Sequence, residues 1–95
     1  MRIVWVNGCF DVLHRGHIEL FKYARAFGGY LVAGVDTDKR VKESKGLSRP
    51  FNNLEDRVAL LEAIKYIDEI RTFDTDDELE TQILLSEAEV IVVGS

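Results

Sequence analysis

Short runs of β-branched and other apolar residues alternate along this chain with segments whose apolar residues recur at helical spacing. The first run, Ile3-Val4-Trp5-Val6, suits a strand that is buried on both faces. In residues 17–27 the apolar positions fall three and four apart, and Gly28-Gly29 end that helical pattern. The alternation predicts strands over residues 2–7, 30–35, 70–73 and 90–93, and helices over residues 17–27, after Asn53, and from a capping box at Thr75-Asp76-Asp77-Glu78.

This order of elements predicts an α/β fold with a doubly wound parallel sheet of about four strands. In such sheets ligands bind beyond the carboxyl ends of the strands, and the first strand delivers Gly8 to that edge. Residues 39–52 are polar, contain the only proline, and are expected to form mainly loop. With 95 residues and no visible linker, the chain is expected to be one domain over residues 1–95.

Charge is distributed unevenly between the two halves of the chain. Residues 1–50 hold nine lysines and arginines against five aspartates and glutamates, whereas residues 51–95 hold three against twelve. An anionic ligand is therefore expected on the first half, unless the acidic half is merely a solvated face. The net charge of −5 argues against nonspecific nucleic-acid binding, and no apolar run is long enough to span a membrane. The single cysteine, Cys9, allows no internal disulfide and favours the cytoplasm.

The segment Asn7-Gly8-Cys9-Phe10-Asp11-Val12-Leu13-His14-Arg15-Gly16-His17 joins the first expected strand to the first expected helix. Gly8 permits the backbone to approach a phosphate closely, and free N–H groups at the helix start favour an anion. His14 and His17 are three positions apart, so both rings can face one side of a helical turn that Gly16 keeps free of bulk. The pattern predicts a phosphate site in which two imidazoles assist a displacement at phosphorus. A bound polyphosphate is expected to raise the pKa of both rings and make them donors.

Other uses of the histidines, Cys9 and Asp11 remain open alternatives. Two histidines at this spacing can be incidental or can bind a metal, although no third ligand is placed convincingly nearby. Cys9 is more often a small buried filler than a nucleophile, and Asp11 can either cap the first helix or help to hold Mg²⁺. Neither a Walker A nor a G-x-G-x-x-G pattern occurs, which argues against P-loop ATPases and dinucleotide-dependent reductases.

Residues 8–17, Gly-Cys-Phe-Asp-Val-Leu-His-Arg-Gly-His, resemble the H-x-G-H signature of the cytidylyltransferase-like nucleotidyltransferases. The resemblance covers nearly the whole chain and implies a Rossmann-like doubly wound sheet. It also implies an enzyme that uses Mg²⁺ and a nucleoside triphosphate, joins the α-phosphate of the nucleotide to a phosphate-bearing acceptor, and releases pyrophosphate. By the same resemblance, His14 and His17 contact the triphosphate and stabilise the transition state, while the backbone of residues 8–10 contacts the phosphates.

The resemblance continues past this motif. Asp36-Thr37-Asp38 ends the second expected strand as in the family, and Lys42 and Lys45 lie where family members place phosphate-binding lysines, with Lys45 favoured. Glu55-Asp56-Arg57 matches an E-x-R at a helix start and implies a nucleotide contact for Arg57, whose alternative is an exposed ion pair. The catalytic residues that the resemblance implies are His14, His17 and Lys45. The nucleotide-binding residues that it implies are Gly8, Cys9, Phe10, Asp11, Gly16, Asp38, Lys42 and Arg57, and no residue is expected to ligate a metal.

Residues 48–57, Ser-Arg-Pro-Phe-Asn-Asn-Leu-Glu-Asp-Arg, are similar to the R-P-x-N-x-L-E-x-R stretch of heptose 1-phosphate adenylyltransferases. This similarity favours ATP and a sugar 1-phosphate as substrates, with CTP and a polyol phosphate such as glycerol 3-phosphate as the alternative. Residues 65–70, Lys-Tyr-Ile-Asp-Glu-Ile, resemble an R-Y-V-D-E-V segment found at the dimer interface of the family. The resemblance therefore implies a homodimer, although lysine here replaces the arginine of that segment.

The chain ends at Gly94-Ser95, directly after the last expected strand. Family members continue there with an acidic-aromatic pair, a fifth strand and a segment such as R-x-x-G-I-S-T-T that closes over the triphosphate. The expectation is therefore a C-terminally truncated domain that lacks the last strand and helix of the family. A noncatalytic nucleotide-binding fragment or subunit is the alternative of another class, and a purely structural interaction domain is a third.

Overall fold

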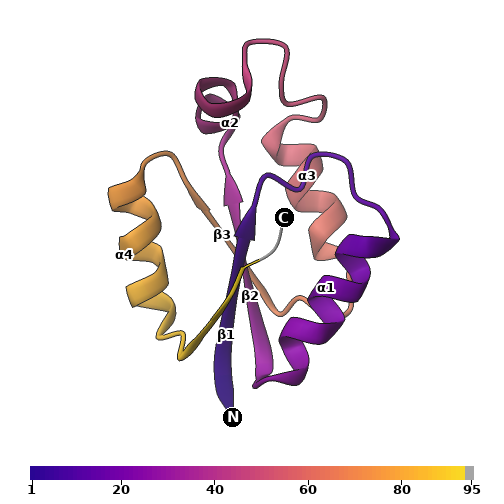
Figure 1. The fold of residues 1–95 in the computed structure, drawn as a ribbon, viewed down its shortest axis with the longest axis vertical. Helices are drawn as coiled ribbons and strands as arrows, with labels where there is room; N and C mark the ends of the chain where they lie inside the picture. The colour runs from indigo at the N-terminus through magenta and orange to yellow at the C-terminus, as the bar shows by residue number, and fades with distance from the viewer. Residues whose placement is uncertain (94–95) are drawn as a thin grey trace.

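The computed structural model describes residues 1–93 of the chain (Figure 1). Within these residues four parallel strands form one sheet, and four helices connect and cover them. The strands are β1 (Arg2–Gly8), β2 (Gly29–Asp36), β3 (Glu69–Phe73) and β4 (Val90–Val92). The helices are α1 (Arg15–Ala26), α2 (Asp38–Lys45), α3 (Leu54–Glu62) and α4 (Asp76–Ser86).

The strands lie in the order β3-β2-β1-β4, and every pairing is parallel. β1 lies inside the sheet, where it pairs with β2 along its whole length and with β4 from Val4 to Val6. Its central side chains are completely buried because helices cover both faces of the sheet. The α/β fold with a doubly wound parallel sheet is thus confirmed, and the carboxyl end of β1 points toward the top of Figure 1.

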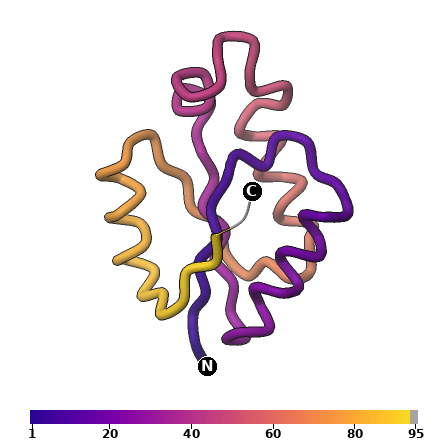
Figure 2. The backbone as a smooth tube through the Cα atoms, viewed as in Figure 1, coloured from indigo at the N-terminus to yellow at the C-terminus, as the bar shows by residue number. Residues whose placement is uncertain are grey.

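Two apolar clusters fill the space on either side of the sheet. On one side α1 and α3 contribute the buried side chains Phe21 and Leu61 to a cluster with β1 and β2. On the other side α4 packs against a smaller cluster of Trp5, Val32 and Phe73. Figures 1 and 2 show α4 on the opposite side of the sheet from α1 and α3. A ligand can therefore approach the backbone of the central strands at the edge where the strands end.

The expectation of loop over residues 39–52 is wrong in its first half, where α2 forms. Thr37 caps this helix, since its Oγ1 accepts a hydrogen bond from the N–H of Arg40 at 3.3 Å. Val41 is the only buried side chain of α2. Its eight residues therefore lack the repeated apolar positions that predicted the other helices. Residues 46–52 contain no helix or strand, in agreement with the expectation.

The capping residues explain where the other helices begin. α1 begins two residues before its expected start because the side chain of His14 caps it. Asn53 caps α3 as predicted. The hydroxyl of Thr75 caps α4 as predicted, but Glu78 accepts from the N–H of Asp74 instead of completing a capping box at Thr75.

The last expected strand forms as β4, which lies beside β1. Gly94 and Ser95, on which the expectation of a truncated domain rests, lie outside the described residues. No helix of residues 1–93 has the length and apolarity needed to cross a membrane.

Candidate active site

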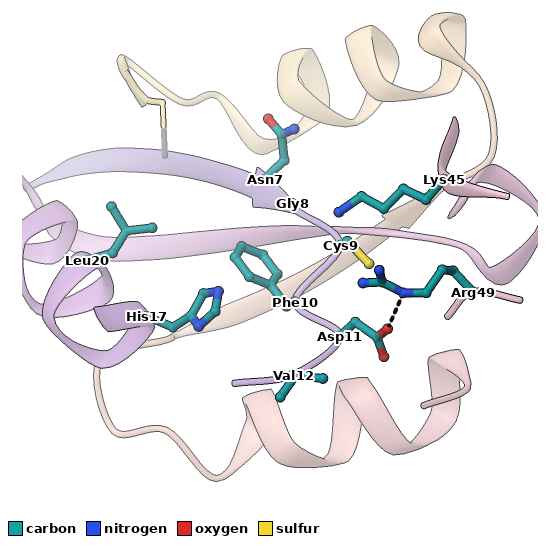
Figure 3. Close-up of a pocket in the computed structure, with 10 residues that line it drawn as sticks. All are labelled: Asn7, Gly8, Cys9, Phe10, Asp11, Val12, His17, Leu20, Lys45 and Arg49. Atoms are coloured by element: carbon teal, nitrogen blue, oxygen red, sulfur yellow. Dashed lines mark hydrogen bonds and ion pairs between the residues drawn. The ribbon is translucent and has the colours of Figure 1, made fainter. Parts of the chain in front are cut away.

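A cavity of about 230 Å³ lies at the carboxyl end of β1 (Figure 3). Pockets that enclose most of a small-molecule ligand span about 300–1,000 Å³, so this volume suits phosphate groups better than a complete nucleotide. The walls come from β1, the turn after it, α1, the end of α2 and the segment that follows. The lining residues are Asn7, Gly8, Cys9, Phe10, Asp11, Val12, His17, Leu20, Lys45 and Arg49.

Phe10 gives the turn after β1 its shape. Its backbone has a φ of 50°, in the left-handed region that residues other than glycine rarely adopt. The ring is almost completely buried, with its centroid 5.2 Å from that of Phe21 and 6.0 Å from that of His17. A Cβ atom on Gly8 would lie 3.1 Å from this ring, so the lack of a side chain there also makes room for Phe10. Backbone strain held in place by packing is frequent at functional sites.

His14 and His17 together form the N-terminal cap of α1. Nδ1 of His14 accepts a hydrogen bond from the N–H of Gly16 at 2.9 Å, and Nδ1 of His17 accepts one from the N–H of His14 at 3.1 Å. The two ring centroids lie 4.2 Å apart, which confirms that both rings face one side of the first turn. A Cβ atom on Gly16 would lie 2.6 Å from the His14 ring, so glycine between the histidines makes the cap possible.

These two hydrogen bonds determine which nitrogen of each ring carries a proton. Because Nδ1 accepts in both rings, each neutral imidazole carries its hydrogen on Nε2. Burial and the neighbouring His14 ring lower the pKa of His17 below its usual value. His17 therefore offers Nε2–H as a donor without a positive charge, and protonation of Nδ1 in either ring would break a bond that caps α1. That a bound nucleotide raises both pKa values stays a prediction.

The two candidate lysines of α2 differ in position. Lys45 is the last residue of the helix and lines the cavity, whereas Lys42 does not. Figure 3 shows the Lys45 side chain extending toward the carboxyl end of β1, with His17 on the other side of Phe10. This placement agrees with the preference for Lys45, whose contact with a ligand stays a prediction.

Asp11 holds the segment after α2 against the turn. Its carboxylate accepts hydrogen bonds from the N–H groups of Phe51 and Asn52, both at 2.8 Å, and pairs with Nε of Arg49 at 3.3 Å. Burial alone would raise the pKa of Asp11, but these bonds outweigh burial and lower that pKa. The alternative in which Asp11 caps the first helix is wrong, because His14 caps it.

Arg57 is completely buried and joins four segments at the same edge of the sheet. Its Nη1 atom donates to the carbonyl oxygens of Cys9 and Asp36 at 2.8 and 2.7 Å. Nε donates to the carbonyl oxygen of Asn52 at 3.0 Å, and Nη2 pairs with the Asp38 carboxylate at 2.7 Å. The alternative of an exposed ion pair is therefore wrong. Neither Arg57 nor Asp38 lines the cavity, and their contact with a nucleotide stays a prediction.

Cys9 is a buried free thiol in the turn. Burial raises its pKa, and the nearby positive charges of Lys45 and Arg57 only partly oppose this effect. The thiol is therefore protonated at neutral pH, which favours the interpretation of Cys9 as a small buried residue and not a nucleophile.

The cavity has few groups that could bind a cation. Within residues 1–93 no group of three or more histidine, cysteine, aspartate or glutamate side chains could hold a metal ion. Asp11 is the one carboxylate among the described residues of the cavity wall, and it already accepts three hydrogen bonds. A role for Asp11 in holding Mg²⁺ stays an alternative, because Mg²⁺ commonly takes only one or two carboxylates together with substrate phosphates. Mg²⁺ stays a prediction, with the phosphates of the triphosphate as its expected ligands.

The structure brings a part of the predicted site together on the cavity wall. The predicted residues that line it are Gly8, Cys9, Phe10, Asp11, His17 and Lys45. The predicted residues that do not line it are His14, Gly16, Asp38, Lys42 and Arg57. The lining residues that sequence reasoning missed are Asn7, Val12, Leu20 and Arg49. Arg49 carries a sequence signal, because it belongs to the R-P-x-N stretch that resembles heptose 1-phosphate adenylyltransferases.

A protein-family model with the description "Cytidylyltransferase-like" matches residues 5–95. The chain belongs to the cytidylyltransferase-like family. The match confirms the resemblance inferred from the H-x-G-H segment. This cytidylyltransferase-like chain is also similar to the crystal structure of the lipopolysaccharide core biosynthesis protein from Thermoplasma volcanium GSS1. The TM-score is 0.83 at 27% sequence identity, and the match covers 96% of this chain and 72% of that one.

Several curated relatives of this cytidylyltransferase-like chain carry the name bifunctional protein HldE. The HldE of Marinomonas sp. (strain MWYL1) is 45% identical over 93 residues, which are 98% of this chain and 19% of the relative. The HldE of Haemophilus influenzae (strain PittEE) is 46% identical over 85 residues, which are 87% of this chain and 18% of the relative. The chain thus spans about a fifth of the length of the curated relatives it matches.

Proposed function

We propose that this chain transfers the nucleotidyl group of a nucleoside triphosphate to a sugar or polyol phosphate and releases pyrophosphate. Membership of the cytidylyltransferase-like family supports this class of reaction. The similarity to HldE proteins and the R-P-x-N stretch favour ATP and heptose 1-phosphate over CTP and glycerol 3-phosphate.

The observation that carries this proposal is the fixed pair of imidazoles beside the cavity. His17 lines the cavity, and the centroid of the His14 ring lies 4.2 Å from that of the His17 ring. Both Nδ1 atoms are occupied by the cap of α1, so the remaining donor of each ring, Nε2–H, has a fixed orientation. Donors that are held in place before the reaction stabilise charge that develops in the transition state at little reorganisation cost.

The proposed reaction is a displacement at the α-phosphorus. An oxygen of the acceptor phosphate forms a bond to this phosphorus, and the bond from the phosphorus to the pyrophosphate oxygen breaks. The electron pair of the broken bond leaves with pyrophosphate, so negative charge increases on the leaving group. The imidazole donors stabilise this charge, and the Lys45 ammonium group, on the other side of Phe10 from His17, neutralises negative charge on the phosphates at the reacting phosphorus. No covalent intermediate on the protein is required, in keeping with the protonated thiol of Cys9.

A pyrophosphate-release assay tests the proposal, with ATP or CTP paired in turn with heptose 1-phosphate, other sugar phosphates and glycerol 3-phosphate. We expect release to require one triphosphate and one acceptor. His14→Asn and His17→Gln keep side chains that suit a capping box, so α1 stays capped while the imidazole is lost. Each change should lower kcat/KM by about 10²–10⁴-fold, because a positioned donor is removed. Lys22→Ala, on the exposed surface of α1, serves as the control and should leave the rate unchanged.

The other outcomes of this assay have distinct meanings. Wild-type turnover by both histidine variants would show that the imidazoles play no part in the mechanism. Calorimetric binding of a triphosphate without pyrophosphate formation from any acceptor would favour a noncatalytic nucleotide-binding fragment. Failure of ATP and CTP to raise the melting temperature at millimolar concentration would favour a structural domain.

Three expectations from the sequence belong to the same proposal. Mg²⁺ is expected to be required, so chelation with EDTA should stop pyrophosphate release and added Mg²⁺ should restore it.

A homodimer is expected to form through residues 65–70, which sedimentation of the chain at several concentrations would test. The expected cytoplasmic location agrees with a single cysteine that is buried and free.

A further inference from the structure

Arg49 lines the cavity and is held in place from two sides. Its Nε atom donates to Asp11 at 3.3 Å, and its guanidinium carbon lies 4.5 Å from the centre of the Phe51 ring. Among the described residues, its terminal nitrogens Nη1 and Nη2 have no hydrogen-bond partner. A planar guanidinium with a fixed orientation and two unused nitrogens is suited to paired hydrogen bonds with phosphate oxygens.

The fold of the segment that carries Arg49 does not depend on the Arg49 side chain alone. The side chain of Asp11 is only 3% exposed, and its carboxylate also accepts hydrogen bonds from the N–H groups of Phe51 and Asn52. In return, the side-chain amide of Asn52 donates to the carbonyl oxygen of Asp11 at 2.7 Å. These three bonds attach the segment to the turn without Arg49. The ion pair with Asp11 therefore serves mainly to orient the guanidinium at the cavity.

The proposed reaction needs anion-binding groups on both sides of the reacting phosphorus. The attacking and leaving oxygens lie roughly in line, so pyrophosphate and the acceptor phosphate cannot use the same donors. The His14 and His17 pair is assigned to the triphosphate. Figure 3 shows His17 and Arg49 on opposite sides of Phe10, so Arg49 is placed for the second anion.

We propose that Arg49 binds the phosphate group of the acceptor, a phosphate monoester of a sugar or polyol, and that Asp11 and Phe51 position it. This inference rests on the proposed function. The γ-phosphate of the triphosphate has the same chemistry and is the other source from which this anion could come. Separate measurements of the affinity for the acceptor and the affinity for the triphosphate show which of the two phosphates Arg49 binds.

Steady-state kinetics with ATP and heptose 1-phosphate test the proposal in wild type, Arg49→Gln and Arg49→Lys. Arg49→Gln should raise the KM for heptose 1-phosphate at least about tenfold, because hydrogen bonds to a charged group are lost, and change the KM for ATP less than about twofold. Arg49→Lys should have an intermediate effect, since lysine keeps the charge without the paired geometry. Asp11→Asn should raise the same KM, and the double variant should be affected less than the product of the two single effects, because part of the effect of Asp11 acts through Arg49.

Arg40 provides a matched control. Its Nε atom pairs with Asp36 at 2.8 Å and its guanidinium carbon lies 5.0 Å from the Phe73 ring, but it does not line the cavity. Arg40→Gln removes the same kind of ion pair and ring contact at another place. It should leave both KM values unchanged.

A binding measurement keeps the test independent of turnover. Heptose 1-phosphate is titrated by calorimetry into the chain saturated with a non-hydrolysable ATP analogue. At least about tenfold weaker binding by Arg49→Gln supports the role of Arg49, whether or not the wild type releases pyrophosphate. Absence of pyrophosphate release from the wild type would count against the proposed function but not against this binding role. Equal affinity of wild type and Arg49→Gln, or a rise confined to the KM for ATP, would overturn it.

Discussion

The Nδ1 atoms of His14 and His17 accept backbone hydrogen bonds, and these bonds couple the charge of the pair to the stability of α1. Protonation of Nδ1 removes the acceptor and breaks the cap. Burial and the neighbouring ring of His14 place the pKa of His17 below its usual value. In the unfolded chain the pKa of this ring is near its ordinary value of 6.5. The unfolded chain therefore takes up the proton at a higher pH than the native state does. Stability from this source is complete above about pH 6.5 and is lost as the pH falls through the lower native pKa.

We accordingly expect the melting temperature of the chain to fall as the pH is lowered from about 7 to about 5. His17→Gln should remove part of this dependence, because glutamine does not titrate. Nuclear magnetic resonance of the ring nitrogens should show the Nε2–H form for both rings and a pKa below 6.5 for His17. Addition of ATP should then raise that pKa. An Nδ1–H form of either ring, or a pKa of His17 at or above 6.5 without nucleotide, contradicts the cap described here.

The contrast between His14 and Arg57 explains which site residues a sequence can reveal. The histidines, the intervening glycine and the preceding strand lie within one short segment, so their spacing predicts that they share a helical turn. Arg57 instead donates to the carbonyl oxygens of Cys9, 48 positions away, and of Asp36, 21 positions away. Bonds to distant backbone atoms leave no periodic pattern, so complete burial of an arginine could not be predicted.

The helix α2 brings Lys45 to the cavity although it has few contacts with the rest of the fold. Val41 is its only buried side chain, and eight residues are too few for a helix to be stable by itself in water. The sequence predicted α1, α3 and α4 from their repeated apolar residues, which α2 lacks. Thr37 caps its first turn, because the Thr37 hydroxyl accepts a hydrogen bond from the N–H of Arg40 and also donates one to the carboxylate of Asp74.

Thr37→Val tests the importance of this cap, because valine keeps the shape of threonine and lacks the hydroxyl. We expect the free energy of unfolding in urea to decrease by about 1–2 kcal/mol, the usual cost of a lost N-cap. Exchange of the N–H of Val41, which bonds to the carbonyl oxygen of Thr37, should become faster. The matched control is Thr81→Val, since the Thr81 hydroxyl donates to a carbonyl on the exposed surface of α4 and caps nothing. Equal stability of the two variants would show that the cap does not hold α2.

The carboxyl edge of the sheet is assembled from segments that are distant along the chain, and Arg57 joins them. It connects the turn after β1, the end of β2, the start of α2 and the segment before α3. The side chain is completely buried, so its loss would leave buried carbonyl oxygens without donors and the Asp38 carboxylate without its partner. The cavity wall would lose its support at the same time, because Cys9 belongs to that wall.

Arg57→Gln should therefore destabilise the entire domain. We expect its free energy of unfolding to decrease by about 3–5 kcal/mol, a large share of the 5–15 kcal/mol that is typical of a domain. Arg71→Gln is the control, because Arg71 is partly exposed and pairs with Glu69, and it should cost less than about 1 kcal/mol. Urea denaturation and ATP calorimetry on the same samples separate two roles. If Arg57→Gln unfolds at the wild-type urea concentration and no longer binds ATP, Arg57 contacts the nucleotide directly, as the sequence predicts. If Arg57→Gln unfolds at a lower urea concentration than the wild type and its folded fraction still binds ATP, Arg57 supports the site by stabilising the fold.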